Sequence, residues 1–102
     1  MTQVIVQIVR FVEEHQPSIV ACELLDAEGR THTFIDKDAM FTTESLSAQS
    51  EYPKSGGIRC ELLDRWQNPK GQELARITTA KPDLVETTDG KSDFVVRASQ
   101  LL

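Results

Sequence analysis

Apolar and polar residues alternate with a period of two along most of this chain. The alternation covers six stretches rich in Val, Ile, Thr and Phe, at residues 2–12, 18–26, 30–36, 57–67, 72–80 and 93–101. Because side chains two positions apart share one face of a strand, this pattern predicts six β-strands. No window repeats apolar residues at helical spacing, although residues 43–49 are compatible with one helical turn. The sequence therefore predicts an all-β protein.

Three turn signals separate the predicted strands. Residues 26–29 and 68–71 each end in Gly, which accepts the left-handed conformation that the fourth position of such a turn requires. Both predict a hairpin with a bulge at Gly. Asp89-Gly90 instead predicts a two-residue hairpin turn of type I′.

Six short strands in one small domain leave open sheet edges, and closure of the sheet removes them. We therefore expect residues 1–102 to form a single domain, a small six-stranded antiparallel or mixed β-barrel. The side chains expected to face inward are Val4, Val6, Ile8, Val20, Cys22, Leu24, Phe34, Ile58, Cys60, Leu62, Ile77, Phe94 and Val96. The same parity directs Leu25, Leu63 and Val95 outward, where the chain or a partner must cover them.

Residues 38–56 form the longest irregular stretch of the prediction. The stretch is polar apart from Met40, Phe41, Leu46 and Tyr52. We expect it to run over the surface and to be held there by these four side chains.

The string Cys-Glu-Leu-Leu-Asp occurs twice, at residues 22–26 and 60–64. It reflects either an internal duplication or two hairpins with the same core requirements, and both interpretations predict equivalent core roles for the two copies. The second copy reaches its turn four residues later than the first, at residues 65–68, and this even number keeps Trp66 on the face of Cys60. Trp66 is then expected to close the end of the core, with an exposed anchor as the alternative.

The charge and cysteine content of the chain disfavour several classes of ligand. The 11 Lys and Arg against 16 Asp and Glu give a formal net charge of -5, which disfavours nucleic acid. Cys22 and Cys60 lack the spacing of a metal or redox motif and are expected to be two buried thiols, with a disulfide or a reactive thiol as the alternatives. We predict no metal, no cofactor and no catalytic residue.

No apolar stretch approaches the ~20 residues that cross a bilayer, and residues 1–10 do not resemble a signal peptide, so we expect a cytoplasmic protein without membrane contact.

Two groups of residues are candidate sites. His32 shares a strand face with Asp36, so this carboxylate can orient its ring, and Arg30 can join them in a ligand-binding site at one mouth of the barrel. The plainer alternative is a rim histidine bonded to a neighbouring strand. The candidate partner-binding residues are the two large amphipathic rings and the outward apolar side chains: Trp66, Tyr52, Leu25, Leu63 and Val95.

Residues 29–34, Gly-Arg-Thr-His-Thr-Phe, follow a hairpin arm that ends in Leu-Leu-Asp. This segment resembles the β-barrel domains of translational GTPases related to elongation factor Tu, which carry a Gly-Arg-His-Thr-Pro-like string at a comparable place. Here Thr31 stands between Arg30 and His32, and no Pro follows Thr33. The chain has no Gly-x-x-x-x-Gly-Lys-Ser/Thr phosphate loop, so the resemblance implies a barrel without GTP hydrolysis.

The chain also resembles short bacterial proteins of unassigned activity. This likeness extends over segments 34–37, 50–53, 60–61, 85–88 and 94–96. It too implies a barrel and no activity.

Three functions remain open at this stage. The first is a small acidic, non-enzymatic barrel that binds a protein partner or associates with itself as a homodimer. The second is a small enzyme or ligand-binding barrel that uses His32 and Asp36. The third, suggested by the translational resemblance, is a ribosome- or RNA-associated barrel, which requires a basic patch formed by Lys54, Arg59, Arg65 and Lys70.

Overall fold

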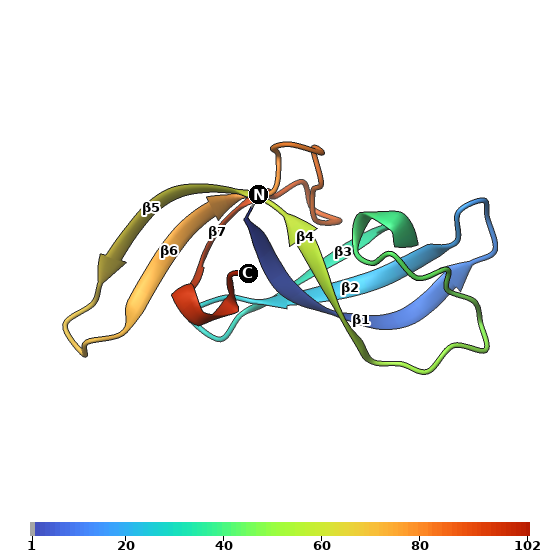
Figure 1. The fold of residues 1–102 in the computed structure, drawn as a ribbon, viewed down its shortest axis with the longest axis horizontal. Coiled ribbons are helices and arrows are strands. Elements are labelled where there is room, and N and C mark those ends of the chain that lie inside the picture. Colours follow the sequence, from blue (N-terminus) through green and yellow to red (C-terminus); the bar gives the residue numbers. More distant parts are fainter. Residues whose placement is uncertain (1) are drawn as a thin grey trace.

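Seven β-strands and two short 3₁₀ helices form the fold in the computed structural model, which describes residues 2–102 (Figure 1). In chain order they are β1 (Gln3–Glu13), β2 (Ile19–Leu25), β3 (Thr31–Lys37), η1 (Asp38–Met40), β4 (Lys54–Arg59), β5 (Glu61–Gln67), β6 (Glu73–Thr78), β7 (Asp93–Arg97) and η2 (Ala98–Gln100). The all-β prediction is confirmed.

The strands form two antiparallel sheets instead of one closed wall. One sheet has the order β3-β2-β1-β4, and the other has the order β5-β6-β7. Within residues 2–102 no strand ladder joins the two sheets, so the prediction of a six-stranded barrel is wrong. The predicted strand 57–67 is interrupted at Cys60, where the chain leaves the first sheet as β4 and enters the second as β5.

Single backbone hydrogen bonds protect three of the four sheet edges, in place of closure. Each of the three edge strands is met by one bond: Thr88 N–H to the Thr33 carbonyl on β3 (3.0 Å), Gly57 N–H on β4 to the Phe41 carbonyl (2.8 Å), and Ala27 N–H to the Val95 carbonyl on β7 (2.8 Å). Buried backbone groups require such partners, and each bond occupies one group of an edge that could otherwise pair with another chain. The fourth edge strand is β5.

The core lies between the two sheets. Every side chain that the alternation directs inward is buried, except Leu62, which is 39% exposed. Phe94 on β7 connects the sheets, because its ring centroid lies 5.8 Å from that of Phe34 and 4.9 Å from that of His32, both on β3. Such edge-to-face contacts between aromatic rings stabilise the packing beyond the area they bury.

Three turns share one hydrogen-bond pattern. In each turn the N–H of the first residue donates to the carbonyl of the fifth residue, and the carbonyl of the first residue accepts from the N–H of the fourth, a glycine. The turns are residues 26–30, 68–72 and 87–91. The three glycines have φ angles of 82–83°. The two bulged hairpins are confirmed. The type I′ turn at Asp89-Gly90 is wrong, because only Gly90 has a positive φ there.

The segment between β3 and β4 is fastened as expected. Phe41 and Leu46 are buried, and Met40 and Tyr52 pack against the core. The buried carboxylate of Asp38 accepts a hydrogen bond from the Leu46 N–H at 2.9 Å. The short helical turn lies at η1, not at residues 43–49.

Candidate functional site

The hairpin formed by β5 and β6 projects from the rest of the molecule (Figure 1). The principal extents of the molecule are 45 × 24 × 24 Å, and all seven residues of β5 are exposed. A strand that packs on a core buries every second side chain, as β1 and β2 do over most of their length. β5 is therefore held by its ladder to β6 and lies outside the core.

A β-bulge decides which way the β5 side chains point. The register leaves one extra residue, Leu63, between two paired positions, Leu62–Ile77 and Asp64–Arg76. One extra residue reverses the alternation of every side chain that follows it. Trp66 therefore pairs with Leu74, on the face opposite the buried Ala75 and Ile77.

The expectation that Trp66 closes the core is thus wrong. Its side chain is 37% exposed beside the half-buried Leu74, which corresponds to the alternative of an exposed anchor. Leu62 and Leu63 are exposed to a similar extent on the same strand, at 39% and 37%. Three large apolar side chains therefore lie within five consecutive residues of β5.

The other candidate partner-binding residues lie in three different places. Val95 pairs with Arg76 and so shares the face of Trp66. Leu25 is 51% exposed and lines a separate groove of about 420 Å³, at whose edge Gln100 Nε2 donates to the Leu25 carbonyl at 2.8 Å. The Tyr52 hydroxyl donates to the Ser47 carbonyl at 2.7 Å and so fastens its own segment. The structure brings Trp66, Leu63 and Val95 onto one sheet and leaves Leu25 and Tyr52 apart from them.

Sequence reasoning missed Leu74, although a signal for it was present. Trp66 and Leu74 stand at equal distances from the ends of the turn Asn68–Gln72, so the hairpin alone pairs them. The bulge carries no such signal, because Leu-Leu is compatible with a regular strand.

His32 has a different carboxylate partner from the expected one. His32 Nε2 lies 2.8 Å from Asp26 Oδ2, and each side chain is 12% exposed. The other carboxylate oxygen of Asp26 accepts the N–H groups of Glu28 and Arg30 at 2.8 and 2.9 Å. The ring of His32 also meets the edge of Phe94. One carboxylate thus stabilises the turn and orients the histidine.

The candidate trio of His32, Asp36 and Arg30 is not assembled. The Asp36 carboxylate accepts the N–H of Lys37 at 2.8 Å, and the Arg30 guanidinium pairs with exposed Glu28 at 3.2 Å. Asp26 was missed because it belongs to the turn, whose bulge returns the carboxylate towards β3.

Electrostatics at Asp26 favour the ionised carboxylate. Burial opposes ionisation, but hydrogen bonds from His32 and from the backbone of Arg30 and Glu28 outweigh it and lower the pKa of Asp26 below its usual value. The pair joins the β2–β3 turn to β7 through Phe94. Within residues 2–102 no group of three His, Cys, Asp or Glu side chains is placed to hold a metal ion.

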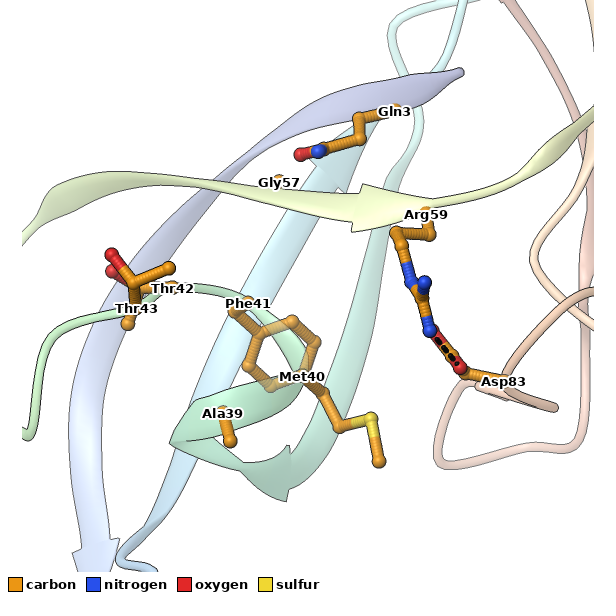
Figure 2. A pocket seen from close by; sticks show the side chains of 9 residues that line it. All are labelled: Gln3, Ala39, Met40, Phe41, Thr42, Thr43, Gly57, Arg59 and Asp83. Atoms are coloured by element: carbon orange, nitrogen blue, oxygen red, sulfur yellow. Dashed lines mark hydrogen bonds and ion pairs between the residues drawn. The ribbon is translucent and has the colours of Figure 1, made fainter. Parts of the chain in front are cut away.

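A pocket of about 470 Å³ lies beside β4 (Figure 2). Figure 2 shows Arg59 reaching from β4 to Asp83, beside Met40 and Phe41. The guanidinium donates from Nε to Asp83 Oδ2 at 2.8 Å and makes a second bond to Oδ1. Because the two charges that line the pocket neutralise one another, it presents little net charge to a ligand.

Carboxylates also pair with most of the cations that a basic patch would need. Lys54 pairs with Glu44 at 2.7 Å, Arg59 with Asp83, and Arg65 with Glu73 at 2.6 Å. Pairing of this kind reduces the positive potential that attracts phosphate.

No family model, curated protein or solved structure matches this chain. The fold and the site therefore define the class of protein: a small all-β protein of two antiparallel sheets with a projecting, partly apolar hairpin. In the part of the chain from residue 2 to residue 102, no helix has the length and apolar character to span a membrane.

Proposed function

We propose that this protein is a non-enzymatic binding module that contacts another protein through the β5–β6 hairpin. The observation that carries the proposal is the exposure of Leu62, Leu63 and Trp66 on a strand that lies outside the core. Trp is among the residues most enriched at the energetic centres of protein interfaces, and several exposed apolar side chains on one strand favour a contact there.

The solvent exposure of the hairpin supports the binding of a partner. Within residues 2–102 the backbone of β5 bonds to β6 alone, and all seven residues of β5 are exposed, so both faces and one edge of the strand meet solvent. Burying the exposed area of these side chains would contribute about 25 cal/mol for each Å² removed from water. A partner that covers the hairpin would therefore stabilise it and gain affinity from the same contacts.

The charge distribution supports the same surface. The hairpin, residues 61–78, carries three acidic and three basic side chains: Glu61, Asp64, Glu73, Arg65, Lys70 and Arg76. Its formal charge is zero, which leaves the whole net charge of -5 on the rest of the chain. A partner with a net negative charge meets less repulsion at the hairpin than elsewhere on the chain.

Capture from native lysate tests the proposal. The immobilised wild-type chain, the double variant Leu63→Ser/Trp66→Ala and the control variant Leu84→Ser are compared by quantitative mass spectrometry of the retained proteins. Leu84 is 68% exposed on the loop between β6 and β7, so the control removes an exposed leucine away from the hairpin.

We expect the double variant to retain roughly a tenth or less of a protein that the wild type captures, since a contact centre contributes more than about 1.4 kcal/mol. The control should retain the wild-type amount. Equal capture by all three folded proteins would refute the proposal.

A further inference from the structure

We propose that the partner of β5 is β5 of a second copy of this chain, paired antiparallel across a two-fold axis. Two three-stranded sheets then become one six-stranded sheet. This inference rests on the proposed function, because it names the occupant of the same hairpin. It follows from the open edge of β5, meaning the side of β5 that faces away from β6.

The open edge of β5 differs from the other three sheet edges. Those on β3, β4 and β7 each make a backbone hydrogen bond to another segment of the chain. Among residues 2–102, no backbone group outside β6 bonds to β5. An uncovered edge strand is a template on which an extended segment can add as a further strand.

The ladder identifies the backbone groups on the open edge. Asn68 N–H donates to the Gln72 carbonyl at 2.9 Å, and pairs of an antiparallel ladder alternate between bonded and non-bonded from there. The N–H and C=O groups of Arg65 and Gln67 therefore point away from β6. The Arg65 N–H donates at 2.7 Å to the neighbouring Asp64 Oδ1, a local acceptor that an incoming carbonyl can replace.

Charge disfavours some of the registers that a two-fold axis permits. Centring the pair on Asp64 sets two carboxylates face to face, which is unfavourable, and centring it on Arg65 brings together two guanidiniums, each of which already pairs with Glu73 of its own chain. Centring it on Trp66 sets Trp66 against the partner's Trp66. In this register Arg65 faces the partner's Gln67, and Asp64 faces the partner's Asn68, which has an amide to donate.

The shape of the molecule fits this arrangement. The hairpin projects from the sheet formed by β1–β4 (Figure 1). Antiparallel pairing of two hairpins would therefore place the two bodies at opposite ends of the joined sheet. The bulge at Leu63 ends the regular part of β5, so the two copies of β5 would pair over residues 64–68. Pairing over so few residues predicts a reversible dimer that forms as the protein concentration rises.

Sedimentation equilibrium of the purified chain, with a proline variant and its matched control, tests the pairing. Gln67→Pro removes an N–H from the open edge and leaves the β6 ladder intact, whereas Gln67→Ala removes the same side chain and keeps the N–H. We expect the wild type and Gln67→Ala to rise from one chain mass towards two, and Gln67→Pro to remain at one. A wild type that stays monomeric at every concentration, or equal association of both variants, would overturn the inference.

Cysteine cross-linking tests the register. In a non-bonded pair the two Cα atoms at position 66 lie about 4.5 Å apart, within disulfide reach, whereas Arg65 and its symmetry mate sit diagonally, beyond about 7 Å. At a protein concentration high enough to offset the loss of the Trp66 side chain, Trp66→Cys should form disulfide dimers under mild oxidation and Arg65→Cys should not. Native Cys22 and Cys60 are buried. Cross-linking of Arg65→Cys alone would overturn the register.

The two proposals fail separately. If the wild type is monomeric but its hairpin still captures a different protein, the dimer is refuted and the binding module is supported. If the wild type is monomeric and capture does not depend on the hairpin, both proposals are refuted.

Discussion

Burial decides the chemistry of the two cysteines. Cys22 and Cys60 are free thiols with exposures of 0% and 2%, as the sequence predicts. Burial raises the pKa of the Cys60 thiol to about 11. Burial and, to a smaller extent, the negative charge of Asp36 raise the pKa of Cys22 even further. The reactive thiolate is therefore scarce at neutral pH.

We expect both thiols to resist a maleimide or disulfide reagent at pH 8 in the folded protein and to react fully in concentrated urea. A time course of labelling followed by mass spectrometry checks this. Rapid labelling of either cysteine without denaturant would contradict the role of burial.

The charge of Asp26 is a second residue-scale determinant. Asp26→Asn keeps an acceptor for the turn N–H groups and removes the negative charge beside His32. We expect a loss of about 1.5–3 kcal/mol in the free energy of unfolding at pH 7, because hydrogen bonds to charged groups have this magnitude. Urea denaturation measures the loss, with Asp36→Asn as a control that leaves His32 and Asp26 in contact.

The same variant has a defined pH dependence. The pKa of Asp26 is lower in the folded protein than its usual 3.8, so the carboxylate contributes stability above that value. This contribution is lost as pH falls through the folded pKa. The difference between wild type and Asp26→Asn should therefore shrink in strongly acidic solution. A difference that grows below pH 3.8 would contradict the assignment.

At the scale of elements, two adjacent glycines in β4 have different surroundings. A Cβ on Gly56 would lie 2.8 Å from the Phe41 backbone carbonyl, whereas a Cβ on Gly57 would meet only the flexible end of Gln3 within 3 Å. The Phe41 carbonyl cannot move freely, because it accepts the hydrogen bond that covers the β4 edge.

We therefore expect Gly56→Ala to lower the free energy of unfolding by about 1–3 kcal/mol, the usual cost of overpacking. Gly57→Ala should change it by less than about 0.5 kcal/mol, because a side chain can move aside. Thermal unfolding of both variants checks the contrast. Equal stabilities would show that the segment after η1 does not press on β4.

The repeated string shows how far an element's sequence decides its environment. Leu24 is completely buried, whereas Leu62, at the same place in the second copy, is 39% exposed. Cys22 and Cys60 are both buried, so the two copies diverge only after the chain enters β5. The equivalent core roles that the repeat predicts thus hold for the cysteines and are wrong for the leucines. The first copy meets the opposite sheet, and the second leaves the core along the hairpin.

At the scale of the whole molecule, the break at Cys60 explains why the strands form two open sheets and no barrel. The sequence predicts six strands that close on themselves, but the break at Cys60 divides the strands between two sheets. Three of the edge strands then bond to backbone groups of other segments: β7 to the Ala27 N–H, β4 to the Phe41 carbonyl and β3 to the Thr88 N–H. The open edge of β5 is what remains, which is why the proposed contact and the proposed pairing both fall on the hairpin.

The sequence by itself determined the strands, two of the three turn types and nearly all of the core, because alternation and turn chemistry act over a few neighbouring residues. It also placed Trp66 and Leu63 among the candidate contact residues, and both are exposed on β5. Only the tertiary structure decided the break at Cys60, the bulge at Leu63 and the partner of His32. Each of these depends on contacts between segments far apart in the chain or on one extra residue in a ladder, and a local pattern of polar and apolar residues carries neither.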